Sequence, residues 1–315
     1  PPSLNPASAS SQGYTGADCG ERACPLMCSN HGNCLETGEC SCSEGWAGED
    51  CSIAVDDLAA EGVEAIEANA DFFLTNSAGM VTETARILHD GGITIRSVHA
   101  PFGNQHSLSA PDEDVRAQAV ETHAQLLRQC AYAGVSVIIA HPGTSEAPDR
   151  VAEMLDWCQQ SLEELAPIAE QTQVRIGLEN MLPNHPGTTG EELLRILDAV
   201  DSPALGVCFD TGHAHCNGDM RGVFEVVKDR IITFHLADND GVGDLHFQPP
   251  YGTVNWIDFV SVFRTMELEY RDFMTVETPP WPGGGYRQLI GQVSALLNHL
   301  EERLARQEQM AAQAS

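Results

Sequence analysis

Carboxylate and imidazole side chains recur at one kind of position in this sequence, the carboxyl end of short runs rich in β-branched residues. These residues are His99, His141, Glu179, Asp210, His235 and Glu277. Both side-chain types transfer protons in enzymes, and both bind divalent metal ions. If the runs are neighbouring strands of one sheet, the six side chains meet at a single site.

Four of these residues form the predicted metal-ligand set, namely Glu179, Asp210, His235 and Glu277. They supply three oxygens and one nitrogen, a mixture that suits Mn²⁺, Mg²⁺, Co²⁺ or Zn²⁺ better than copper or an iron–sulfur cluster. Burying four such groups together would be too costly without a metal ion or a substrate. The sequence therefore predicts a divalent metal site.

The segments that carry these residues alternate between strands and helices. The expected strands are 63–68, 95–101, 135–141, 174–181, 205–210, 231–238 and 274–278, and the expected helices are 55–60, 112–133, 151–171, 190–200, 220–229, 256–266 and 285–306. This alternation predicts βαβ units and a parallel sheet. Polar residues at six successive strand ends favour a (β/α)8 TIM barrel over an open doubly wound sheet. Only seven strands can be counted, so the first strand is either irregular, within 51–55, or missing.

Cysteine is concentrated at the N-terminus, where seven of the 11 cysteines lie in the first 51 residues. This density predicts a small module held by disulfides. From Cys24 to Cys51 the order is C-x3-C-x5-C-x5-C-x-C-x8-C, without the paired C-x-x-C spacings typical of a zinc cluster. Spacing alone leaves 15 connectivities open.

With its Gly45-Trp46-Ala47-Gly48 turn, this cysteine order resembles an EGF-like module of the tenascin type. The resemblance implies the pairs Cys24–Cys34, Cys28–Cys40 and Cys42–Cys51. We expect the module to be a spacer, with a protein or glycan partner as the alternative. If the pairs form, the compartment is oxidising.

These patterns divide the chain into four parts. We interpret 1–18 as a linker or the remnant of a preceding repeat, 19–52 as the EGF-like module, 53–305 as the barrel and 306–315 as a flexible tail. The unpaired Cys19, the turn-like segment before it and the start at Pro1 indicate a piece of a longer secreted or cell-surface protein.

Composition excludes some classes of function. The net charge is −30, which disfavours binding to nucleic acid through its phosphates. No apolar run approaches the roughly 20 residues that a transmembrane helix needs. The hydrophobic share of 42% is sufficient for a large buried core. Composition therefore argues against a nucleic-acid binder and against a transmembrane helix in this stretch.

The strand ends resemble the xylose-isomerase-like TIM-barrel superfamily, and within it the sugar phosphate isomerase/epimerases. The motifs are Ser97-Val98-His99-Ala100-Pro101, His141-Pro142-Gly143, Gly177-Leu178-Glu179-Asn180, Asp210-Thr211-Gly212-His213, His235-Leu236-Ala237-Asp238-Asn239, Val276-Glu277-Thr278 and the loop 244–256. The resemblance implies one divalent ion on the four ligands and a small sugar, ketose or inosose as substrate. Glu179 and Glu277 would remove and return a proton α to the carbonyl through a metal-bound enediolate.

The same superfamily contains endonuclease IV, whose ligand pattern is similar to nine residues here. They are His99, His141, Glu179, Asp210, His213, His235, Asp244, His246 and Glu277. This alternative, a metal-dependent hydrolase or lyase, implies two or three zinc ions, but the negative charge argues against DNA as its substrate. In an epimerase, His99, His141, His213, Asp244 and His246 would bind the substrate or a second metal. A third alternative is an inactive extracellular metal-binding barrel, and a homo-oligomer is compatible with all three.

Overall fold

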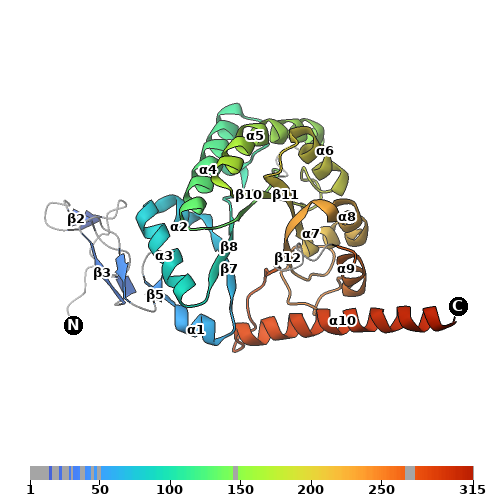
Figure 1. Cartoon of the computed structure of the whole chain (residues 1–315). Helices are drawn as coiled ribbons and strands as arrows, with labels where there is room; N and C mark the ends of the chain where they lie inside the picture. Colours follow the sequence, from blue (N-terminus) through green and yellow to red (C-terminus); the bar gives the residue numbers. More distant parts are fainter. Residues whose placement is uncertain are drawn as a thin grey trace, which may run out of the picture.

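The computed structural model describes residues 14–15, 21–22, 28–29, 31–35, 40–43, 46–47, 51–144, 148–266 and 274–314. Helices surround a curved sheet, a small N-terminal module lies at one side, and a long C-terminal helix extends beyond the barrel (Figure 1).

Seven parallel strands form the barrel sheet, in the order β13-β12-β11-β10-β9-β8-β7. They are β7 (Ala65–Asn69), β8 (Thr94–His99), β9 (Val137–Ala140), β10 (Arg175–Glu179), β11 (Leu205–Asp210), β12 (Ile231–Leu236) and β13 (Thr275–Val276). Each strand pairs with the next one along the chain, and helices cover the outside of the sheet, as in a TIM barrel. The predicted parallel α/β barrel is therefore confirmed, and it is nearly closed.

Helices connect the strands. They are α1 (Val55–Ala60), α2 (Ala70–Thr75), α3 (Ala78–Asp90), α4 (Glu113–Tyr132), α5 (Val151–Thr172), α6 (Gly190–Val200), α7 (Thr211–Cys216), α8 (Met220–Val227), α9 (Trp256–Phe263) and α10 (Tyr286–Ala314). Side-chain caps explain several of their starts. Asp112 accepts hydrogen bonds from two backbone N–H groups of α4, and Thr189 forms a capping box with Glu192 at α6.

The first strand of a complete eight-stranded barrel is missing from the described part of the chain. The segment that could have supplied it contains β6 (Ile53–Ala54), which pairs antiparallel with β5 (Trp46–Ala47) of the N-terminal module. Helix α1 then begins directly at Val55. The sequence left two possibilities open, an irregular first strand or a missing one. The structure supports a missing strand, because Ile53–Ala54 pairs with β5 of the module and not with the barrel sheet.

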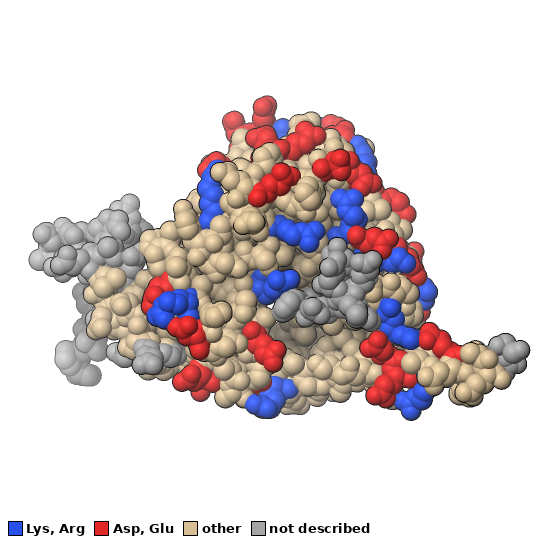
Figure 2. All heavy atoms as spheres, in the orientation of Figure 1, with Lys and Arg blue, Asp and Glu red and all other residues tan. Residues whose placement is uncertain are grey.

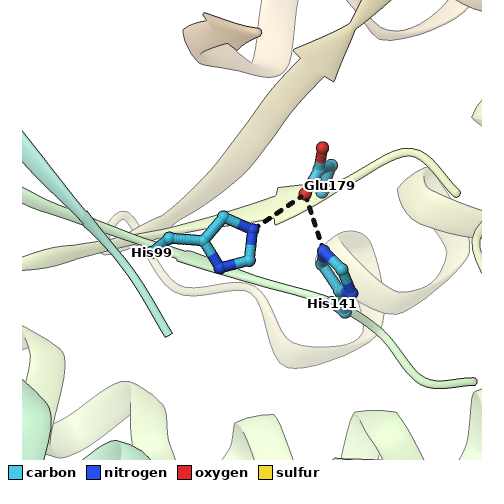
Figure 3. Close-up of side chains that lie close together, drawn as sticks. All are labelled: His99, His141 and Glu179. Atoms are coloured by element: carbon cyan, nitrogen blue, oxygen red, sulfur yellow. Dashed lines mark ion pairs between the residues drawn. The ribbon is translucent and has the colours of Figure 1, made fainter. Parts of the chain in front are cut away.

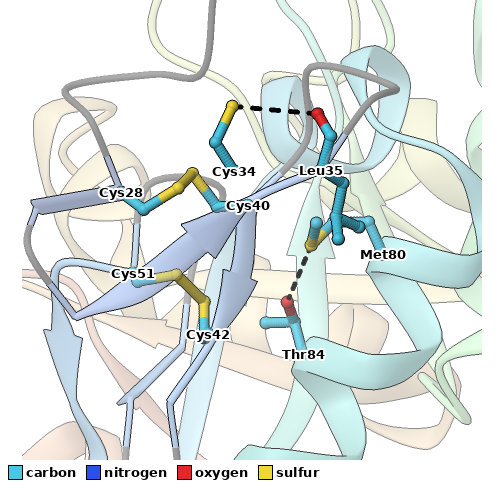
Figure 4. The surroundings of a disulfide bond; sticks show 8 residues. All are labelled: Cys28, Cys34, Leu35, Cys40, Cys42, Cys51, Met80 and Thr84. Carbon is cyan, nitrogen blue, oxygen red and sulfur yellow. Dashed lines mark hydrogen bonds between the residues drawn. A yellow bond between two sulfur atoms is a disulfide. The ribbon is translucent and has the colours of Figure 1, made fainter.

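The N-terminal region contains three small antiparallel ladders, the first of which begins at Tyr14, within the segment 1–18 that we interpreted as a linker or the remnant of a preceding repeat. β1 (Tyr14–Thr15) pairs with β2 (Glu21–Arg22), β3 (Gly32–Cys34) with β4 (Cys40–Cys42), and β5 with β6. The disulfides Cys28–Cys40 and Cys42–Cys51 are two of the three pairs that the EGF resemblance implies (Figure 4). The third pair, Cys24–Cys34, includes Cys24, which lies outside the described residues.

The module is packed against the barrel. Ala47 of β5 is completely buried and belongs to the same apolar cluster as the barrel core. β5 lies against α3, and Val55, which follows β6, is buried close to Gly91 at the end of α3. The boundary near residue 52 therefore separates two folds that share a packed interface.

The C-terminal helix continues further than the sequence predicts. α10 runs to Ala314, through most of the segment 306–315 that we expected to be a flexible tail. Arg264, just after α9, binds both carboxylate oxygens of Glu308 at 3.0 and 2.9 Å, which attaches this part of α10 to the barrel. At the other end, the backbone N–H of Arg287 donates to Glu61 beside α1. No described helix meets the length and hydropathy of a membrane span.

Candidate metal centre

The four predicted metal ligands come from four adjacent strands. Glu179 is the last residue of β10, Asp210 the last of β11, His235 lies near the end of β12, and Glu277 directly follows β13. In the register of the sheet, Asp210 is level with His235. Because the strands are parallel, their carboxyl ends lie at one end of the barrel. One donor atom from each of the four residues lies within 4.8 Å of the others.

His235 is at the centre of this group. Its Nδ1 atom lies 3.1 Å from Glu179 Oε1 and 3.1 Å from Glu277 Oε2. Asp210 Oδ2 is 3.9 Å from the same nitrogen. Three carboxylates thus lie around one ring nitrogen of a single imidazole. We call Glu179, Asp210, His235 and Glu277 the central cluster.

The central cluster is mostly closed to solvent. The side chains of Glu179, Asp210 and His235 are at most 1% exposed, whereas Glu277 is 30% exposed. Burial raises the pKa of Asp210 to about 7, although the charge of His213 opposes this shift. Burial also raises the pKa of Glu277, but the hydrogen bond and charge of His235 outweigh it, so this pKa lies below its ordinary value. Three carboxyl groups thus share a largely buried space, where a bound cation would favour their ionised forms.

A second group of donors adjoins the central cluster through Glu179. Its Oε2 atom lies 3.0 Å from His141 Nε2 and 3.7 Å from His99 Nε2 (Figure 3). The three donor atoms lie within 4.8 Å of one another. Oε2 is buried without a well-aligned hydrogen bond. Glu179 therefore faces His235 with one oxygen and the pair His99 and His141 with the other.

A third group contains the remaining predicted site residues. Asp244 Oδ2 lies 3.0 Å from His246 Nε2 and 3.4 Å from His213 Nε2. The outer nitrogens are also in hydrogen-bond contact, since His246 Nδ1 is 2.7 Å from Glu277 O and His213 Nδ1 is 2.9 Å from Asn180 O. The structure thus brings all nine predicted residues to one end of the barrel, and their roles in binding and catalysis stay predictions.

Local structure explains how these side chains are placed. Asp210 caps α7, and its Oδ1 accepts a hydrogen bond from the backbone N–H of His213, so both residues are fixed by one strand–helix junction. The loop that carries Asp244 and His246 returns to the end of β12 through the backbone pair Asp238 and Phe247. Buried Asp238 also accepts a hydrogen bond from the indole N–H of Trp256, which fixes the end of this loop to α9.

Two residues of the site were not predicted from the sequence. Glu67 of β7 lies 3.0 Å from His235 Nε2, on the opposite side of the ring from the central cluster. Asn180 holds the end of β11, because its amide N–H donates to Asp210 O and its Oδ1 accepts from Asp210 N. A carboxylate within the apolar run 65–68 was the available signal for Glu67, since a charged residue there is costly unless it has a partner.

With the site described, the chain can be compared with known proteins. Residues 55–295 match the family described as xylose isomerase-like TIM barrel. The chain belongs to this family. Residues 24–54 match a teneurin-like EGF domain, which confirms the EGF-like module. The two matches meet at the junction between β6 and α1, where the structure changes from module to barrel.

Individual relatives cover parts of the chain. An uncharacterized protein of Methanocaldococcus jannaschii is 34% identical over 188 residues, which is 57% of this chain and 63% of that protein. A probable endonuclease 4 of Acholeplasma laidlawii is 31% identical over 164 residues, 50% of this chain and 53% of that protein. The chain thus spans less than two thirds of the length of both curated relatives.

Solved structures resemble the barrel over most of its length. A D-tagatose 3-epimerase-like protein is 26% identical, with a TM-score of 0.69, and the match covers 80% of this chain and 94% of that one. The IolI protein, solved with a bound zinc atom, is 20% identical with a TM-score of 0.66, over 79% and 92% of the two chains. The second likeness shows the fold alone.

Proposed function

We propose that this protein is a divalent-metal-dependent isomerase or epimerase of a small sugar, ketose or inosose. The observation that carries the proposal is the central cluster, in which two glutamates, an aspartate and a histidine from four adjacent strands meet at one end of the barrel. The likeness to a D-tagatose 3-epimerase-like protein at 26% identity supports a sugar as the substrate.

The residues present fit a divalent ion. Among the described residues, Glu179, Asp210 and Glu277 form ion pairs only with histidines, and no lysine or arginine neutralises them. The buried Oε2 of Glu179 is without an aligned hydrogen-bond donor. Three oxygens and one nitrogen would hold the ion, which would stabilise the negative charge that develops on substrate oxygens. Manganese, magnesium, cobalt and zinc all suit these donors.

Glu179 and Glu277 are the proposed proton-transfer groups. They come from β10 and β13, which are separated in the sheet by β11 and β12, and both reach His235 Nδ1. Epimerisation removes a proton from one face of a carbon and returns one to the other face, so it needs two such groups. The pKa of each carboxyl lies below its ordinary value, because contacts with histidines outweigh the effect of burial. Both are therefore ionised at neutral pH and can act as bases.

The remaining site residues surround the central cluster and would contact the substrate. His99 and His141 contact Glu179, and His213, Asp244 and His246 form the adjoining group. Phe102 is 63% exposed, with its ring 5.4 Å from that of His99, which places an apolar side chain at the edge of the site. Imidazole and carboxylate groups can hydrogen-bond the hydroxyls of a polyhydroxy carbonyl compound.

The substitution Glu277→Gln tests this mechanism. It removes the carboxylate that accepts the proton but keeps an oxygen that can ligate the metal. We therefore expect kcat to fall by about 10²–10⁴-fold. Metal binding should weaken much less. Turnover of a ketose panel, hydrogen exchange at the substrate carbon in D2O and metal affinity would be measured on the protein loaded with manganese or cobalt. Glu164→Gln, at an exposed position of α5, is the matched control. Normal turnover by Glu277→Gln would show that the two-base mechanism is wrong.

A hydrolase or lyase of the endonuclease IV type is the second candidate. The group of His99, His141 and Glu179, next to the central cluster, is the observation that favours it, because it could hold a further zinc ion. On the face in Figure 2, basic side chains are scattered among acidic ones and form no continuous basic surface. A net charge of −30 also opposes binding to DNA.

Metal content separates the candidates. The protein would be dialysed against a metal mixture and analysed by mass spectrometry. One manganese, cobalt or magnesium ion per chain supports the epimerase, whereas two or three zinc ions support phosphoester hydrolysis. A chain that retains no metal would favour an inactive barrel.

We further propose a secreted or cell-surface location, a protein or glycan partner for the EGF-like module, and a homo-oligomer.

A further inference from the structure

The two nitrogens of His235 face different carboxylates. Nδ1 points into the central cluster, 3.1 Å from Glu179 and Glu277, whereas Nε2 lies 3.0 and 3.2 Å from the two carboxylate oxygens of Glu67. A neutral imidazole carries one N–H and one lone pair, so the partner of one nitrogen decides what the other can do. Glu67 is thus placed to determine how His235 binds.

We propose that Glu67 is a positioning residue that accepts the Nε2–H of His235, so that the Nδ1 lone pair is directed at the metal. This inference rests on the metal site of the proposed function. A carboxylate accepts hydrogen bonds, so once a metal ion takes the Nδ1 lone pair, the ring proton lies on Nε2 and is donated to Glu67. Outer carboxylates of this kind fix the orientation of a ligating histidine and increase its basicity.

The surroundings of Glu67 hold it in this position. Ser97 of β8 donates a 2.6 Å hydrogen bond to Glu67 Oε2, and Glu67 and Ser97 are partners in the β7–β8 register. Ser97 is 1% exposed and the Glu67 side chain 10% exposed. The contact therefore extends from β8 through β7 to β12, across the interior of the barrel. It connects β7 and β8, at one end of the strand order, to His235 in β12 near the other end.

Burial makes this contact important. The His235 side chain is completely buried, so water cannot easily replace a lost partner at Nε2. The Cys208 thiol also lies within 4.8 Å of the imidazole, but a thiol is a weaker hydrogen-bonding group than a carboxylate. Without Glu67, the proton would be free to move to Nδ1, where it would block metal binding.

Zinc-loaded protein provides a direct readout of the bound nitrogen. Histidine ¹⁵N–¹H correlation spectra should show Nδ1 of His235 as the metal-bound nitrogen and Nε2 as the protonated one. Zinc affinity would be measured in parallel by competition with a chelator. We expect Glu67→Leu to lower this affinity by about 10–100-fold and to shift the Nε2–H resonance away from its hydrogen-bonded position.

Two further variants and one control complete the test. Glu67→Gln keeps an oxygen acceptor, so its zinc affinity should stay close to that of the wild type. Ser97→Ala removes the hydrogen bond that holds Glu67 and should lower the zinc affinity about threefold, less than the loss typical when a direct partner of a metal ligand is removed. If Glu67→Leu does not fold, these two variants carry the test. Glu64→Gln, an exposed carboxylate beside the same strand, should change neither readout.

The outcomes distinguish this inference from the proposed function. Zinc bound through Nε2, or unchanged affinity and resonance in Glu67→Leu and Ser97→Ala, would overturn the role of Glu67 while leaving the metal site intact. Wild-type protein that takes up no zinc, manganese or cobalt would overturn the metal site and this role together. Nδ1 ligation in the wild type with the graded loss in the variants would support both.

Discussion

The EGF-like module and the barrel are stabilised in different ways. The module's own buried cluster consists of Cys28, Cys40 and Cys51, with Cys42 and Trp46 packed against it. The barrel buries an extensive apolar core, which includes five phenylalanine rings with centroids 4.5–6.2 Å apart. These rings belong to Phe209, Phe224, Phe234, Phe259 and Phe263. A module of this size cannot bury enough apolar surface and depends on covalent links, whereas the barrel depends on packing between distant segments.

The two forms of stabilisation meet at the junction between the module and the barrel. Ala47 belongs to the module by its strand pairing and to the barrel by its burial. The segment before α1 pairs within the module and not with the barrel sheet. The module is therefore joined to the barrel as a packed neighbour at the position in the chain where a first strand would come. We expect the two regions to respond to different perturbations.

The largest expected effect is a cavity in the barrel core. Phe234 is completely buried and contacts four other phenylalanine rings, so Phe234→Ala should lower the free energy of unfolding by about 3–5 kcal/mol. Urea unfolding followed by circular dichroism would measure it. Tyr132→Ala, at a side chain 59% exposed, is the control and should change the free energy by less than about 0.5 kcal/mol. Equal losses in both variants would contradict a barrel stabilised by this core.

Loss of a disulfide should act on the module instead. Replacing Cys42 and Cys51 together by alanine removes one link and should destabilise the module by about 2–4 kcal/mol. Amide hydrogen exchange should then increase in β3–β6 and in the adjoining α1, while β10–β12 stay protected. Cys130→Ala, which removes a buried free thiol from α4, is the matched control and should leave exchange in the module unchanged. Increased exchange throughout the barrel strands would show that the two regions unfold as one unit.

Acid should destabilise the barrel more than the module, and by less than the loss of a disulfide destabilises the module. Burial lowers the pKa of His123 in α4 to about 4, although its hydrogen bond to Ala119 O opposes this shift. Between the ordinary pKa of 6.5 and about 4, only the unfolded chain takes up the proton, so stability is complete above pH 6.5 and falls as the pH decreases. At pH 5 the loss from this group is about 2 kcal/mol.

Urea midpoints at pH 7.5 and pH 5 would measure this loss. The variant His123→Gln does not titrate, so the difference between its two midpoints should be smaller than in the wild type. The same difference in both proteins would show that His123 does not contribute. Exchange in the module's strands should respond less than exchange in α4, because His123 lies in the barrel.

Much of the barrel could be predicted because it depends on local patterns. The strand 205–210 and the helices 55–60 and 190–200 have the predicted bounds, and the other predicted strands agree to within a few residues. Their apolar runs and capping residues are short-range signals. The helices α2, α3 and α7 were missed, and the C-terminal helix was predicted too short. The contact between Arg264 and Glu308, which lie 44 residues apart in sequence, is not visible in a local pattern.

The sequence by itself determined which donor residues end the strands and that these strands are parallel, since a polar residue after an apolar run is a local feature. It also determined the cysteine spacing of the module. Only the tertiary structure decided that Ile53–Ala54 pairs with the module and that Glu67 contacts Nε2 of His235. It also decided that Glu179 faces His235 with one oxygen and the pair His99 and His141 with the other. These are contacts between residues distant in sequence, and such contacts depend on how the whole barrel packs.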